Sequence, residues 1–131
     1  MTVRRLAHLS DIHFGGEHVD AVAGARAWIA EHRPDLTVIT GDVTREGSPV
    51  EFAAARKWIH SLASEFLVVP GNHDTPYYSL AHRLFQPWKR YKTYFGALQD
   101  GPVQRAGVAI APVNTARGAQ LRANWSKGAI T

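Results

Sequence analysis

The chain has 131 residues, a formal net charge of +4 and 45% apolar residues, which suits a single globular domain over residues 1–131. It contains no cysteine, so disulfides and thiolate metal sites are excluded, and we expect a reducing, cytoplasmic location. No apolar run approaches the roughly 18 residues needed to span a bilayer, so we expect no membrane partner.

The first half of the chain alternates short apolar runs with amphipathic segments, which is typical of an α/β fold. Strands are expected over residues 3–9, 36–40 and 66–69, with helices over residues 19–33 and from 49 to about 64. Pro34 cannot continue the first helix. The second helix begins with a capping box, in which Ser48 is the N-cap, Pro49 the first helical residue and Glu51 the reciprocal partner. The order β-α-β-α-β follows.

The second half is less regular. Residues 75–96 are aromatic and basic, with a helix expected over 80–85 and a second short helix or turn from Pro87 to Gly96. This segment is either a packed connection or a cap that shapes a substrate site. Residues 103–105 and 107–113 are expected to form a hairpin or two short strands around Ala106-Gly107. A basic cluster is either a solvated helix face or a contact for nucleic acid or phosphate: Arg83, Lys89, Arg90 and Lys92.

Polar side chains follow each of the three expected strands. Asp11 and His13 come after the first, Gly41-Asp42 after the second, and Gly71-Asn72-His73-Asp74 after the third. The spacing of about 30 residues is that of one strand–helix–strand unit, and parallel strands deliver such residues to the carboxyl edge of one sheet. If the segment after the first strand stays extended, Asp11 and His13 lie on one side of it. Carboxylates, an amide oxygen and imidazoles suit a divalent metal of the manganese, iron or zinc type.

These motifs resemble the opening motifs of the calcineurin-like metallophosphoesterases: Ser10-Asp11-Ile12-His13, Gly41-Asp42 and Gly71-Asn72-His73-Asp74. The surrounding sequence, about residues 3–115, is similar to the cyclic-nucleotide phosphodiesterase-like bacterial members. The resemblance implies that Asp11 and His13 bind a first metal, that Asp42 bridges two metals and that Asn72 binds the second. It implies that His73 contacts the substrate phosphate or protonates the leaving oxygen, while Asp74 holds its ring. The implied fold is the β-α-β-α-β half of a four-layer sandwich.

The sequence also departs from the family. The family continues with further histidines, including a Gly-His-x-His motif, and this chain has no histidine after His82. We therefore expect the C-terminal half of the sandwich to be missing, the second metal to be weak and an apolar face and a strand edge near residues 108–113 to be uncovered. Thr131 is expected to cap a helix that would follow. His18 is expected on the surface, although its loop could reach the mouth of the site, and Arg45 is expected in solvent rather than on a phosphate.

Three functions remain open at this point. The first is a metal-dependent phosphoesterase that hydrolyses phosphomonoesters or phosphodiesters, including nucleotide-like ones, once its ligand set is complete. The second is a non-catalytic half-domain that binds metal, self-associates or assembles with a partner chain. The third is a nuclease of the same superfamily, for which salt-dependent DNA binding would be diagnostic.

Overall fold

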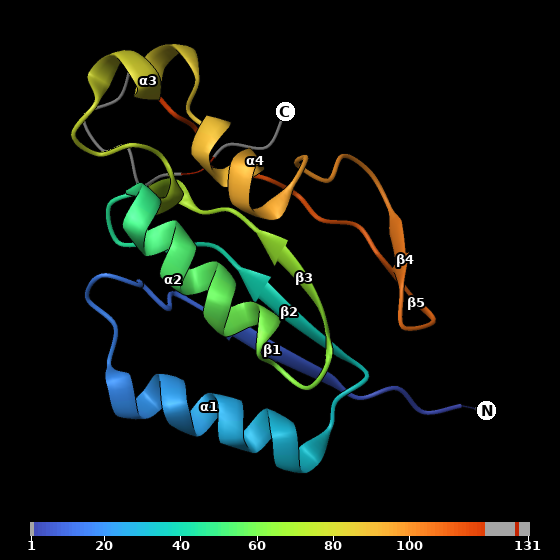
Figure 1. Ribbon diagram of the computed structural model, residues 1–131. Helices are drawn as coiled ribbons and strands as arrows, with labels where there is room; N and C mark the ends of the chain where they lie inside the picture. The colour runs from blue at the N-terminus through green and yellow to red at the C-terminus, as the bar shows by residue number, and fades with distance from the viewer. Residues whose placement is uncertain (1, 120–127, 129–131) are drawn as a thin grey trace.

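The computed structural model describes residues 2–119 and residue 128. Its centre is a parallel sheet of three strands in the order β1-β2-β3, formed by β1 (Leu6–Ser10), β2 (Leu36–Thr40) and β3 (Glu65–Val69) (Figure 1). Leu6 pairs with Leu36, and Leu36 pairs with Glu65, so the three strands end at the same edge. The first strand begins at Leu6 rather than at residue 3, and Val3 is 82% exposed. The α/β fold with a parallel sheet is confirmed.

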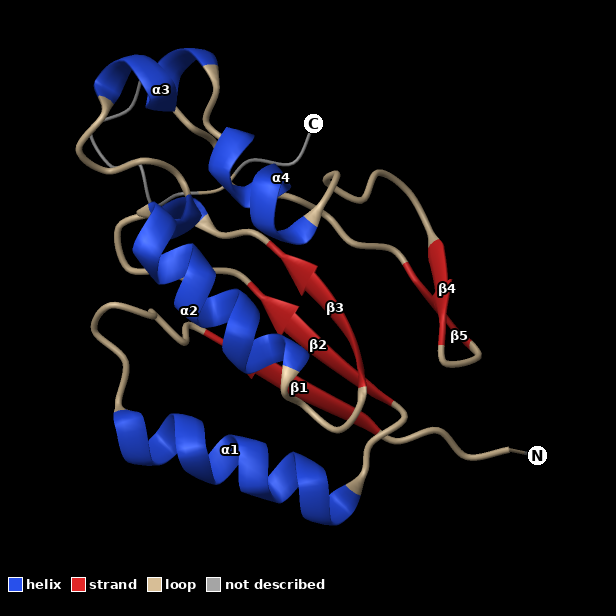
Figure 2. Ribbon diagram, in the orientation of Figure 1, coloured by secondary structure: helices blue, strands red, loops and turns tan. Residues whose placement is uncertain are grey.

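Two helices connect the strands, α1 (Val19–His32) and α2 (Pro49–His60) (Figure 2). The strand order and right-handed crossovers place both on one side of the sheet, and one core cluster joins Ile29 of α1, Phe52 and Ile59 of α2 and Ile39 of β2. The predicted capping box is present, with the Glu51 N–H donating to Ser48 Oγ and the Ser48 N–H donating to Glu51 Oε2. This helix ends at His60, four residues earlier than expected.

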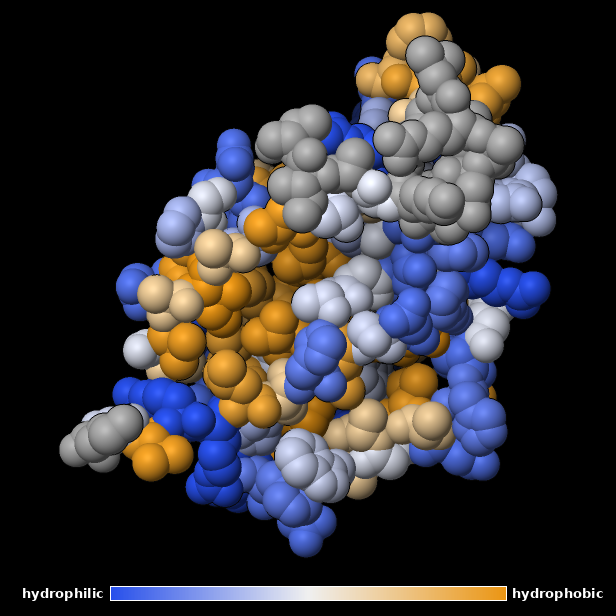
Figure 3. All heavy atoms as spheres, turned by 180° about the vertical axis from the view of Figure 1, so that it is seen from behind, coloured by the Kyte–Doolittle hydropathy of each residue, from blue (hydrophilic) through white to orange (hydrophobic). Residues whose placement is uncertain are grey.

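The opposite face of the sheet is apolar and partly open. Figure 3, seen from behind, shows hydrophobic atoms gathered over this face. Leu6 is 50% exposed and Val113 is 55% exposed. The expected uncovered apolar surface is therefore present in the described part of the chain, whereas the self-association it would favour stays a prediction. The expected cap at Thr131 lies outside the described residues.

After the sheet come a 3₁₀ turn η1 (Asn72–Asp74), two short helices α3 (Leu80–Phe85) and α4 (Lys89–Phe95), and a hairpin of β4 (Val103–Arg105) and β5 (Val108–Ile110). Helix α4 packs on α2 through the Phe52 and Tyr94 rings, whose centroids are 5.5 Å apart. The Tyr91 hydroxyl donates to the carbonyl of Val68 in β3 (2.9 Å). Helix α4 is thus a packed connection. None of the described helices is long and apolar enough to cross a membrane.

Candidate metal centre

The loops after β1 and β2 remain hydrogen-bonded beyond the ends of their strands. The His13 N–H donates to the Asp42 carbonyl (3.0 Å), and the Phe14 N–H donates to the Val43 carbonyl (2.9 Å). The Gly41 N–H donates to the carbonyl of Val69 at the end of β3 (2.8 Å). These bonds fix the backbones that carry the candidate ligands relative to one another, so the site is part of the sheet framework.

Asp11, His13 and Asp42 converge at this edge, as expected from their positions after successive strands. One ligand atom from each lies within 4.8 Å of the other two. The His13 Nε2 is 3.9 Å from Asp11 Oδ1 and 3.9 Å from Asp42 Oδ2, so the imidazole faces both carboxylates. The Asp11 side chain is 66% exposed and the Asp42 side chain 15% exposed, which leaves the group open to solvent on one side.

The backbone at all three residues is left-handed, with φ of 53° at Asp11, 54° at His13 and 49° at Asp42. The expectation that Asp11 and His13 share one side of an extended segment is therefore wrong, because β1 ends at Ser10 and the chain turns at each of the two residues. Non-glycine residues in this region cost about 1–3 kcal/mol each and persist where the surroundings hold them. Because three of them carry side chains of metal-ligand type, this edge is the candidate functional site.

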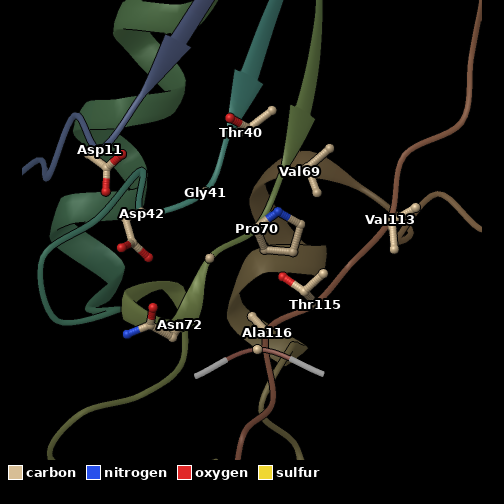
Figure 4. A pocket seen from close by; sticks show the side chains of 12 residues that line it. Asp11, Thr40, Gly41, Asp42, Val69, Pro70, Asn72, Val113, Thr115 and Ala116 are labelled. Atoms are coloured by element: carbon tan, nitrogen blue, oxygen red, sulfur yellow. The ribbon is translucent and has the colours of Figure 1, made fainter. Parts of the chain in front are cut away.

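Asn72 extends the group toward β3. Figure 4 shows the Asp11 and Asp42 carboxylates and the Asn72 amide following one another along one side of a hollow. Thr40, Val69, Val113 and Thr115 line the same hollow. Asp42 and Asn72 are joined through the backbone, since the N–H of His73 donates to Asp42 Oδ1 (3.0 Å).

The His73 ring lies against that of His13, with centroids 4.8 Å apart in an edge-to-face arrangement. Its Nδ1 is 2.7 Å from the carbonyl oxygen of Arg45. Because a carbonyl oxygen only accepts, Nδ1 must carry a proton, and Nε2 is the nitrogen left for chemistry. The ring orientation is thus set by the backbone of the loop after β2.

The prediction that Asp74 holds the His73 ring is wrong. Asp74 is fully buried, and its carboxylate accepts from the N–H groups of Gly71 (2.8 Å), Val43 (3.2 Å) and Thr44 (2.8 Å), and from the Thr44 hydroxyl (2.8 Å). Burial raises the pKa of the Asp74 carboxyl, and these hydrogen bonds oppose that shift. The residue ties the loop after β2 to the turn after β3, so it positions the site without facing it.

Three further residues near the site are His18, Thr44 and Arg45. His18 is the N-cap of α1, with Nδ1 accepting from the Ala21 N–H (3.3 Å), and lies on the surface as expected. The Arg45 side chain is exposed, as expected, but its carbonyl has a role that the residue type could not indicate. Thr44 was also missed, because a threonine two residues after Asp42 carries no signal of a partner 30 residues later.

Gly71 is required by the close approach of two loops. A Cβ there would come within 2.1 Å of Asp42 Oδ1 and 2.3 Å of the Asp42 backbone nitrogen. We expect Gly71→Ala to displace Asp42, to lower the free energy of unfolding by about 1–3 kcal/mol and to weaken metal binding. Gly24→Ala is the matched control, because a Cβ at Gly24 in α1 meets nothing within 4 Å and alanine favours helix. Urea unfolding should show opposite signs for the two variants, and equal signs would contradict the assignment.

The fold and this edge together define a class, an α/β protein with a carboxylate–imidazole centre at the carboxyl ends of parallel strands. A model of the calcineurin-like phosphoesterase family matches residues 4–109. The chain therefore belongs to the calcineurin-like phosphoesterase family.

Several curated proteins are similar to the chain. It is 35% identical over 80 residues to the glycerophosphodiester phosphodiesterase GpdQ of Enterobacter lignolyticus, covering 53% of this chain and 29% of that protein. It is 29% identical over 83 residues to a probable cyclic nucleotide phosphodiesterase of Synechococcus, covering 54% and 31%. It is 26% identical over 113 residues to the 3',5'-cyclic adenosine monophosphate phosphodiesterase CpdA of Escherichia coli K12, covering 78% and 36%. The chain thus spans about a third of the length of these relatives.

Proposed function

We propose that the chain carries part of the active site of a metal-dependent phosphoesterase that hydrolyses phosphodiesters. The observation that supports this most directly is the convergence of Asp11, His13 and Asp42, all with left-handed backbones, at the carboxyl edge of the parallel sheet. The similarity to proteins named glycerophosphodiester and cyclic nucleotide phosphodiesterases favours a phosphodiester over other esters.

The donor set fits a divalent ion of the manganese, iron or zinc type. Two carboxylates and one imidazole are the mixed oxygen and nitrogen ligands that such ions accept. When bound, a metal pair would supply Lewis-acid polarisation of a phosphoryl oxygen and would lower the pKa of water toward neutral. Asp42 lies between His13 and the turn that carries Asn72, so its carboxylate is the one suited to serve two ions. We propose that Asp11 and His13 hold the first ion and that Asn72 offers its amide oxygen to the second.

His73 is proposed to act on the substrate. Its Nδ1 proton is held by the Arg45 carbonyl, so Nε2 is left to accept in the neutral ring and to donate in the imidazolium. The imidazolium form could donate to a phosphate oxygen or protonate the leaving oxygen. His73 is thus assigned to the reacting group, and Asp74 to positioning.

Among the described residues, only one group of three carboxylate and imidazole ligands is close enough to share an ion, and it consists of Asp11, His13 and Asp42. We propose that the second ion is weak here and that its shell is completed by residues that this chain does not supply. The same observation favours a second function, a half-domain that binds one ion and assembles with a partner.

An activity assay separates these two functions. The chain is assayed with manganese on bis(4-nitrophenyl) phosphate, alone and fused to the part of the Enterobacter relative that lies beyond the matched segment. We expect little turnover from the chain alone and manganese-dependent turnover from the fusion. A fusion that is folded and binds manganese but does not turn over would favour the non-catalytic half-domain.

Metal titration of the chain alone tests the ligand roles. Asp42→Asn keeps an acceptor for the His73 N–H and removes the charge, so the fold should persist while manganese affinity falls. Supporting residues outside the ligand set already change metal affinity by about 10–100-fold, so we expect a loss at least that large. Asn72→Ala should lose less, because Asn72 is assigned to one weakly held ion. Equal affinities for the two variants, measured by manganese electron paramagnetic resonance, would argue against a shared Asp42.

A further inference from the structure

Helix α3 has its polarity inverted relative to a helix that packs on a core. Arg83 is 8% exposed, and its Nε donates to the carbonyl of Gly118 (2.9 Å). On the same helix Leu80 is 61% exposed, Leu84 48% and Phe85 82%. Arginine is rarely buried and leucine commonly is, so this arrangement indicates a surface with an apolar partner.

Basic side chains continue this apolar surface. Phe85 and Trp88 line a groove together with Lys89 and Lys92, which are both exposed. The sequence has no aspartate or glutamate between residues 75 and 99, so every formally charged side chain of this segment is a lysine or an arginine. We give the name α3 surface to the exposed side chains of Leu80, Leu84 and Phe85 on α3, together with those of Lys89 and Lys92 on the neighbouring helix α4. In Figure 1 α3 lies at an outer corner of the molecule, and Figure 3 shows hydrophobic atoms at that corner from behind.

We propose that the α3 surface binds peripherally to a membrane that contains anionic phospholipids. Leu80, Leu84 and Phe85 would enter the boundary between headgroups and acyl chains, and Lys89 and Lys92 would lie against lipid phosphates. Such binding needs no spanning helix, so it is compatible with the lack of one among the described residues. It departs from the expectation of no membrane partner, because the sequence alone does not show which face of α3 is turned outward.

The composition of the surface favours a membrane over other partners. A second copy of the chain would bring Lys89 and Lys92 against their own like charges. Nucleic acid is bound through cations and stacking rings, and the exposed aliphatic Leu80 and Leu84 have no part in such contacts. A membrane with anionic lipids offers acyl chains to the apolar side chains of the α3 surface and phosphates to its two lysines.

The test is flotation of the full chain with vesicles. Vesicles of phosphatidylcholine and phosphatidylglycerol in equal amounts are compared with vesicles of phosphatidylcholine alone, in low salt and in 0.5 M salt (a Debye length of about 4 Å). We expect binding to the anionic vesicles that weakens in high salt. Leu84→Ser with Phe85→Ser should lower the partition coefficient by at least about tenfold. Lys89→Gln with Lys92→Gln should lower it by about fivefold for each lysine.

The control is Val50→Ser, which removes another exposed apolar side chain, 80% exposed at the start of α2, and should leave binding unchanged. All substituted side chains are exposed, and circular dichroism checks that each variant is folded. Failure of the wild-type chain to float with anionic vesicles would overturn the proposal, as would equal loss in the Val50 variant. Retention on single-stranded DNA that does not depend on Leu84 and Phe85, without vesicle binding, would assign the basic segment to nucleic acid. None of these outcomes depends on phosphoesterase activity.

Discussion

Asp74→Ala should lower the free energy of unfolding by at least about 3 kcal/mol. The Asp74 carboxylate accepts four hydrogen bonds, three of them from the backbone N–H groups of Gly71, Val43 and Thr44. Each buried donor left without an acceptor costs about 1–3 kcal/mol. Domains of this kind are stable by only about 5–15 kcal/mol in total, so the loss is a large share of the fold.

Asp74→Asn gives the intermediate member of the series. An asparagine keeps one carbonyl oxygen, but its amide group must face donors on the other side, so about half of the acceptor capacity is lost. Asp20→Asn is the matched control, because Asp20 is exposed in the first turn of α1, where a carboxylate contributes less than about 1 kcal/mol. In urea unfolding, the loss in free energy of unfolding should be smallest for Asp20→Asn, larger for Asp74→Asn and largest for Asp74→Ala. An Asp74→Ala variant within 1 kcal/mol of the wild type would remove the residue from the framework of the site.

The fold was predictable because its signals are local. The capping box of Ser48 and Glu51 and the break at Pro34 are each set within a few residues of sequence, and the structure places α1 and α2 accordingly. The hairpin at Ala106-Gly107 is also local, since both residues adopt positive φ between β4 and β5. The gathering of Asp11, His13 and Asp42 followed from the period of the strands and needed no detail of the loops.

The parts that sequence reasoning got wrong depend on contacts between distant segments. Asp74 looks like a partner for the neighbouring His73, but three of its four donors belong to Val43 and Thr44, about 30 residues earlier. The true partner of the His73 ring is a backbone carbonyl, which has no residue type to recognise. The outward leucines of α3 were missed for the same reason, because Arg83 is buried through a bond to Gly118, 35 residues away.

His73 gives the prediction with the largest expected effect on rate. Its two links to the site are separable, since the backbone N–H holds Asp42 Oδ1 and only the ring meets the Arg45 carbonyl. In His73→Ala the backbone N–H remains, so Asp42 should keep its place and manganese affinity should change little. A general acid contributes about 10²–10⁴-fold to rate, and we expect turnover on bis(4-nitrophenyl) phosphate to fall by that order.

The measurement uses the fusion described above, with manganese content and turnover determined on the same preparation. His60→Ala is the matched control, because His60 lies at the end of α2 with its ring against Phe66, at a centroid distance of 5.0 Å. That variant should keep both metal and turnover. If His73→Ala lost manganese in proportion to turnover, His73 would be a metal ligand. If it kept both, the acid would have to come from elsewhere. Loss of turnover with manganese retained is the result that assigns Nε2 of His73 to the substrate, while Nδ1 donates to the Arg45 carbonyl.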